Sequence, residues 1–105
     1  MNFREFAEKS IVILDGAMGS MLERRGMQAG ERSEMRSLTH PDQITEIHRL
    51  YYESGASVVN TNTFGCSPLR YSDDELRELV GAAVRCAEAA RSTARGVGRA
   101  LSRLI

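Results

Sequence analysis

The sequence contains no tryptophan, only two prolines and two cysteines, and no excess of charge of either sign. Cys66 and Cys86, with no signal peptide ahead of them, do not make the disulfide framework of a small secreted domain. The 14 basic residues match the 14 acidic ones, so no overall positive field favours nucleic acid or a membrane surface. Residues 1–10 carry charges throughout, and the apolar run at residues 11–14 is too short to span a membrane. We therefore expect a cytoplasmic protein that binds neither nucleic acid nor a membrane.

The composition is that of a folded protein, with 42% hydrophobic and 27% charged residues. A chain of 105 residues corresponds to one small domain. A complete (β/α)₈ barrel needs about 250 residues. A sequence of this length therefore has room for less than half of such a barrel.

Alternating apolar patterns predict an α/β fold in the order helix, strand, helix, helix, strand and long helix. The β-branched run at residues 11–14 is typical of a strand buried on both faces of a parallel sheet, and residues 57–62 form the second strand. Residues 27–38 are polar and are predicted to be a surface loop. The predicted helices cover residues 3–9, 18–26, 39–54 and 72–94, the last opened by the capping box of Ser72 and Glu75.

Both predicted strands end in polar residues, where parallel sheets bind their ligands. Asp15 ends the first strand, and a carboxylate there can hold an ammonium group by a charge-assisted hydrogen bond. Gly16 and Gly19 let backbone N–H groups approach a ligand carboxylate closely. Together these features suit an α-amino acid. The alternative is that Asp15 and Gly16 form a plain turn at the strand exit.

Four further polar residues have a structural and a functional interpretation. Asn62 and Thr63 either orient a substrate or cap the exposed backbone of the second strand. His40 and His48 are predicted to lie at a helix cap or on a helix surface rather than to bind a metal. No local spacing in the sequence builds a metal site.

The two cysteines are assigned structural roles. Cys66 is predicted to be a small loop residue rather than a reactive thiol or metal ligand, because no activating base is evident. Cys86 is predicted to pack as an apolar residue, and Met18 and Met21 are predicted to fill the core. Four arginines repeat near the end of the chain and form either a solvated tail or a basic patch for an acidic partner: Arg91, Arg95, Arg99 and Arg103.

Four segments, taken in order, resemble the homocysteine S-methyltransferase family, whose domains also form the N-terminal module of cobalamin-dependent methionine synthase. They are ILDGAMGSML at residues 13–22, LTHPDQI at 38–44, YESGA at 52–56 and TNTFG at 61–65. The resemblance covers about residues 11–90, and residues 91–105 diverge from the family pattern. Ser37 and Ser67 also stand where the family usually has asparagine.

The resemblance implies a (β/α)₈ barrel, of which residues 1–105 are the first two β/α units, an incomplete homocysteine-binding domain. The family transfers a methyl group to the homocysteine thiol to give methionine. Asp15 matches the carboxylate that helps to hold the amino acid, and Asn62 matches the polar position beside it. The backbone of the turn matches the carboxylate-binding segment, which consists of Gly16, Ala17, Met18 and Gly19.

The resemblance also implies zinc, held in the family by three cysteines near the end of the barrel. Neither Cys66 nor Cys86 matches those ligands, so this chain is expected to be inactive by itself. Cobalamin is implied only for a full-length methionine synthase. Expected partners are homocysteine and, through open sheet edges, the remainder of a barrel or a second copy. The alternative is a non-catalytic small α/β module that binds an amino acid or a partner chain.

Overall fold

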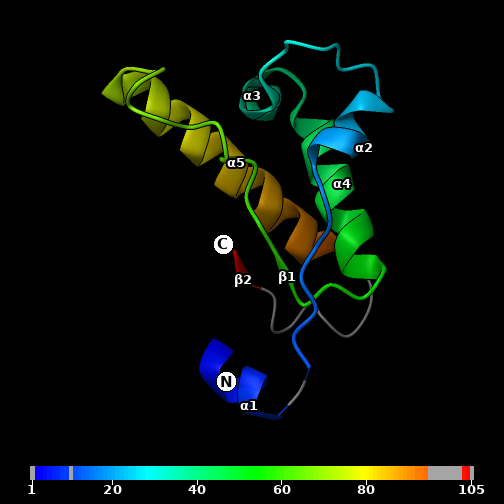
Figure 1. Ribbon diagram of the computed structural model, residues 1–105. Coiled ribbons are helices and arrows are strands. Elements are labelled where there is room, and N and C mark those ends of the chain that lie inside the picture. The colour runs from blue at the N-terminus through cyan, green and yellow to red at the C-terminus, as the bar shows by residue number, and fades with distance from the viewer. Residues whose placement is uncertain (1, 10, 95–102, 105) are drawn as a thin grey trace.

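The computed structural model describes residues 2–9, 11–94 and 103–104, and helices dominate it (Figure 1). In chain order the elements are α1 (Phe3–Lys9), α2 (Gly19–Glu23), the 3₁₀ helix η1 (Ser33–Met35), α3 (Arg36–Thr39), α4 (Pro41–Glu53), β1 (Val58–Val59), α5 (Asp73–Thr93) and β2 (Arg103–Leu104). β1 pairs with β2 in parallel, and Leu14 forms a single parallel bridge to Val58 on β1. The parallel pairing predicted for the two sequence segments is therefore present, but it is short.

The core lies where α4 and α5 pack against each other and against β1. The alanine face of α5 contacts Val59 of β1 and Tyr52 of α4, because small side chains let the strand approach the helix closely. A second cluster surrounds Ile44 and Ile47 of α4 and includes Cys86. Met18, Met21 and Met27 pack against this second cluster. The prediction that Cys86, Met18 and Met21 are packing residues is confirmed.

The ends of the two long helices follow local signals in the sequence. At the start of α5 the Glu75 backbone N–H donates to Ser72 Oγ at 3.2 Å, and the Ser72 N–H donates to Glu75 Oε1 at 2.8 Å. α4 ends at Glu53, and Gly55 follows with a φ of 115°, a conformation that favours glycine. The predicted capping box and helix stop are confirmed.

The prediction that residues 11–14 form a strand buried on both faces is wrong. Ile11 is 86% exposed, Ile13 52% and Leu14 57%. The segment pairs with β1 along one edge only, through bonds such as the one from the Val58 N–H to the Ile13 carbonyl at 3.4 Å. A parallel strand is buried on both faces only when further layers cover it, and the described residues supply no such cover.

The second predicted strand, residues 57–62, is also shorter than expected. The ladder includes only Val58 and Val59 of this segment. Beyond Val59 the backbone N–H of Asn60 donates to the Asp15 carboxylate instead of to a neighbouring strand. The Asp15 side chain therefore accepts the hydrogen bond that a backbone carbonyl would accept in a longer strand.

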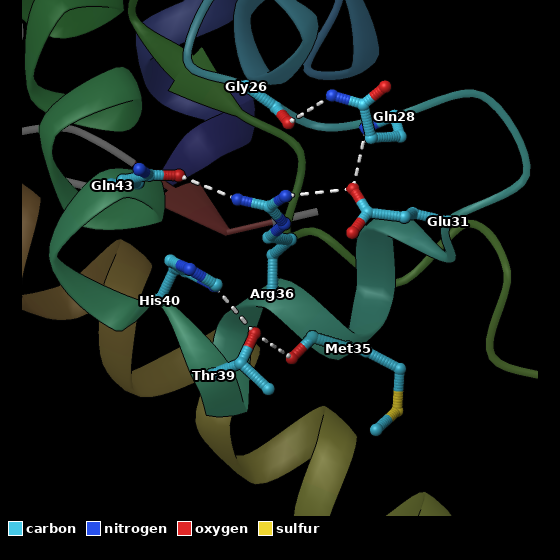
Figure 2. A network of polar contacts seen from close by, with 8 residues as sticks. All are labelled: Gly26, Gln28, Glu31, Met35, Arg36, Thr39, His40 and Gln43. Carbon is cyan, nitrogen blue, oxygen red and sulfur yellow. Dashed lines mark hydrogen bonds and ion pairs between the residues drawn. The ribbon is translucent and has the colours of Figure 1, made fainter.

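The prediction of a surface loop at residues 27–38 is wrong for its second half, which forms η1 and α3. Arg36 is only 8% exposed and organises the segment from its centre. Its guanidinium donates to Glu31 Oε2 at 2.8 Å and to Gln43 Oε1 at 3.2 Å (Figure 2). The polar composition concealed this order because hydrogen-bonded polar groups, rather than apolar ones, hold the segment together.

The prediction that His48 lies at a helix surface or cap is wrong, because its side chain is fully buried in α4. Position 48 falls on the same face as Ile44, four residues earlier, and that face packs into the core. Burial lowers the His48 pKa to about 4. His40 is exposed at the N-cap position of α4, with Nδ1 2.8 Å from Thr39 Oγ1.

Two further predictions concern the membrane and the arginine tail. No helix in the described part of the chain is long and apolar enough to cross a membrane.

Arg91 is exposed on the last turn of α5. Arg95 and Arg99 lie outside the described residues, so the predictions for the tail remain predictions.

Candidate functional site

A pocket of about 610 Å³ opens where the two polar segments meet. The pocket is lined by Asp15, by the turn that follows it at residues 16–19 (the glycine turn), and by residues 60–64. Ser33 of η1 completes the wall. The structure therefore brings together Asp15, Gly16, Met18, Gly19 and Asn62. Ala17 is exposed and does not line the pocket with its side chain.

Asp15 is partly buried, and both of its carboxylate oxygens accept hydrogen bonds from Asn60. The Asn60 backbone N–H donates to Oδ2 at 3.1 Å, and its side-chain Nδ2 donates to Oδ1 at 3.0 Å. Burial raises the pKa of Asp15, and the two Asn60 bonds act in the opposite direction. The result is a carboxylate held in one orientation at the edge of the pocket.

The glycine turn lies against the ring of Tyr51 on α4. The Tyr51 hydroxyl donates to the Ala17 carbonyl at 2.7 Å. A Cβ placed on Gly16 would lie only 2.8 Å from that hydroxyl oxygen, so a larger residue would displace the turn or the ring. A glycine is therefore required at position 16 because the Tyr51 ring lies so close to the backbone there. Tyr51 anchors the turn that was predicted to bind a carboxylate.

Asn62 is 6% exposed, and its amide nitrogen is directed into the protein. Nδ2 donates to the Ser33 carbonyl at 2.7 Å and to Ser37 Oγ at 3.2 Å. These bonds connect the segment after β1 to η1 and α3. In this structure Asn62 shapes the pocket wall through its contacts with the neighbouring helical turns.

Glu34 on η1 is 3% exposed, and its carboxylate contacts Gly65 at the end of the segment 60–65. Its Oε2 accepts a hydrogen bond from the Tyr71 hydroxyl at 2.7 Å and lies 3.7 Å from Arg70 Nη1. A second pocket of about 400 Å³ lies beside Glu34 and shares Ser33 and Phe64 with the first. The Phe64 side chain is fully exposed at the junction of the two pockets.

Gly65 contacts the Glu34 carboxylate so closely that a Cβ there would collide with it. We expect Gly65→Ala to lower the free energy of unfolding by about 2 kcal/mol, because the buried carboxylate would lose its place against Tyr71. Urea unfolding monitored by circular dichroism measures the change. Gly19→Ala is the matched control, since its Cβ would meet nothing within 4 Å at the start of α2. Equal effects of the two substitutions would contradict the role assigned to the contact.

The two thiols lie in different environments. Cys66 is partly exposed, and its pKa is raised by burial and by the negative charge of Glu34. A raised pKa disfavours the thiolate, which supports the prediction of a structural loop residue. Buried Cys86 donates from Sγ to the Pro41 carbonyl at 3.6 Å.

The zinc implied by the resemblance finds no ligand set in the described part of the chain. There, no group of three or more histidine, cysteine, aspartate or glutamate residues could hold a metal ion. A protein zinc site requires at least three such ligands. No chemical step through zinc is therefore derived from these residues.

Tyr51 and Glu34 were missed at the level of sequence, and Asn60, at the polar end of the second predicted strand, was not paired with Asp15. Tyr51 lies 34 positions from Ala17, and Asn60 lies 45 positions from Asp15. The polar end of the second predicted strand indicated Asn60, but nothing in the sequence indicated that Asn60 bonds Asp15. For Glu34 no local signal exists, because a glutamate in a polar segment is normally solvated.

Comparisons with known proteins identify the family to which the chain is similar. The family profile described as homocysteine S-methyltransferase matches residues 12–103. The methionine synthase of Mycobacterium leprae is 36% identical over 87 residues, which covers 71% of this chain and 7% of that protein. The methionine synthase of Mycobacterium tuberculosis is 37% identical over 81 residues, covering 66% of this chain and 7% of that protein.

A solved structure gives the same result. The oxidized form of the homocysteine methyltransferase MmuM from Escherichia coli superposes with a TM-score of 0.75 at 30% identity. The match covers 85% of this chain and 33% of MmuM. The chain thus spans about a third of that structure and a small part of each methionine synthase. Because the family profile matches most of its length, the chain belongs to the homocysteine S-methyltransferase family.

Proposed function

We propose that this chain binds homocysteine in the pocket between Asp15 and residues 60–64, as part of a protein that methylates the homocysteine thiol to give methionine. The observation that carries the proposal is the joint presence of a carboxylate and a glycine turn at one pocket. The Asp15 carboxylate accepts the α-ammonium group, and backbone N–H groups of residues 16–19 face the α-carboxylate. Asn62 keeps the wall of the pocket in place through Ser33 and Ser37.

The fold proposal is that these residues are the first two β/α units of a (β/α)₈ barrel. It is supported by the parallel bridge from Leu14 to Val58, by the parallel pairing of β1 with β2 and by the match to MmuM. The exposed side chains of Ile11, Ile13 and Leu14 then face the remainder of a barrel or a second copy. An experimental structure in which residues 11–14 do not run beside β1 would contradict this proposal.

Binding and catalysis are separated in this proposal. Zinc would supply the activated thiolate in the family, and the described residues do not hold it. Cobalamin belongs to the proposal only for a full-length methionine synthase, and the methyl donor is not assigned. Both cysteines are free thiols, in agreement with the proposed cytoplasmic location.

Calorimetric titration with three small thiols tests the proposed function. L-Homocysteine is compared with 4-mercaptobutyrate, which lacks the amino group, and with 3-aminopropanethiol, which lacks the carboxylate. We expect homocysteine to bind and each analogue to bind about tenfold more weakly, because each loses one charge-assisted contact. Absence of homocysteine binding, or equal affinity for 4-mercaptobutyrate, would overturn the proposal.

An assay of methionine formation tests the alternative, a non-catalytic binding module. With zinc and a methyl donor added, we expect the chain alone to form no methionine. In that case methionine formation restored by the remainder of a barrel added in trans would support a catalytic unit, whereas homocysteine binding by a cooperatively folded chain without such restoration would favour the binding module. Measurable methionine formation would show that this chain is itself a complete catalyst.

A further inference from the structure

We propose that Asn60 is a positioning residue that presents the Asp15 carboxylate to the amino group of the bound ligand. The inference deepens the proposed function and rests on it. Asn60 follows β1 directly and lines the same pocket as Asp15 and the glycine turn. Nothing in the family resemblance assigned a role to this position.

The geometry is a two-point clamp on one carboxylate. Each Asp15 oxygen accepts one hydrogen bond from Asn60, at 3.1 Å from the backbone and 3.0 Å from the side chain. An ionised carboxylate offers about four lone-pair sites. Two are occupied by the clamp, which fixes the plane of the group and leaves the remaining sites to a ligand.

The contact is polar rather than a by-product of packing. Asn60 is exposed, so burial of its side chain does not explain its orientation. Its backbone N–H also donates to the Asp15 carboxylate, 45 positions away in the sequence. The backbone donor persists in any substitution, so the side-chain amide is the part of the clamp that can be tested.

The charges around Asp15 leave the ligand as its cationic partner. Among the residues that the structure describes, no arginine, lysine or histidine forms an ion pair with Asp15. Burial and the donors of Asn60 are the main influences on its pKa. An ammonium group therefore meets a carboxylate that is already oriented but not neutralised.

The experiment measures Asp15 directly and ligand binding separately. The titration of the Asp15 carboxyl carbon is followed by NMR in the ligand-free chain, in wild type, Asn60→Ala and Asn60→Asp. Homocysteine affinity is then measured by calorimetry between pH 4 and pH 8 in the same proteins. Asn2→Ala is the control, because Asn2 is an amide residue that caps the distant helix α1.

Three results are expected if Asn60 positions Asp15. Asn60→Ala raises the Asp15 pKa, weakens homocysteine binding about fivefold at pH 7.5 and moves the acidic limb of the binding profile to higher pH. Asn60→Asp keeps the shape of the side chain but places a like charge beside Asp15, so the limb moves further in the same direction. Asn2→Ala changes none of these quantities.

Two other results separate the two proposals. An unchanged Asp15 pKa and an unchanged pH profile in both Asn60 variants, with normal homocysteine binding in wild type, would overturn the positioning role alone. No homocysteine binding in wild type, with a shifted Asp15 pKa in the variants, would overturn the proposed function and the positioning of a ligand while leaving the clamp itself intact. A purely structural role would change stability without moving the Asp15 titration.

Discussion

Replacing Asp15 by asparagine is expected to weaken homocysteine binding roughly 100-fold. The substitution keeps the size of the side chain and removes the charge that the ligand ammonium would meet. It also places an amide opposite Asn60. In the wild-type chain the backbone N–H and Nδ2 of Asn60 donate to the two oxygens of the Asp15 carboxylate. The loss thus includes a charge-assisted contact to the ligand and part of the clamp. Calorimetric titration at pH 7.5 measures the effect.

Asp74→Asn is the matched control for charge. Asp74 is exposed in the first turn of α5, away from the residues that line the pocket. We expect its substitution to leave homocysteine affinity within twofold of wild type. Thermal unfolding of both variants checks that the fold is retained. An Asp15→Asn chain that binds homocysteine within threefold of wild type would remove the carboxylate from the proposed site.

The stability of the fold is expected to fall by roughly 2 kcal/mol as the pH drops from 7.5 to 5, because of His48. The ring is fully buried, and its two nitrogens have no hydrogen-bond partner in the described structure. Burial lowers its pKa from 6.5 to about 4, so the unfolded chain binds a proton in this range and the folded chain does not. The contribution of His48 is therefore complete above pH 6.5 and is lost as the pH falls toward 4.

Urea unfolding at several pH values between 7.5 and 5 measures this dependence. We expect His48→Leu to flatten the curve, because leucine fills similar space without a proton to gain. His40→Gln removes the exposed histidine and should leave the slope unchanged. Exposed carboxylates with lowered pKa values, such as Glu31 and Glu75, affect stability only below their usual range near 4.5 and thus outside this window. Parallel curves for wild type and His48→Leu would contradict the assignment.

Much of the helical structure could be predicted because its signals are local. The apolar period of α4, the capping box at Ser72 and Glu75 and the glycine after α4 all act within a few residues. The predicted site residues at the carboxyl ends of the two predicted strands also come together around one pocket, since these ends of parallel segments lie at the same edge. The sequence motifs further sufficed to recognise the family.

The failures have a common physical cause. Exposure of Ile11 depends on whether another layer covers a strand, which the apolar pattern of that strand does not encode. Burial of Glu34 depends on Tyr71 and Gly65, more than 30 positions away. The polar segment at residues 27–38 concealed helical turns because its order comes from paired polar groups rather than from an apolar stripe.

The sequence by itself determined the family, the positions of the long helices and the two polar segments that form the pocket. Only the tertiary structure decided which polar groups meet there: Asn60 on Asp15, Tyr51 on the glycine turn and Asn62 on η1. Periodicity and capping are properties of neighbouring residues, and they can be recognised along the chain. A hydrogen bond between residues 45 positions apart exists only because α4, α5 and β1 pack in one particular way.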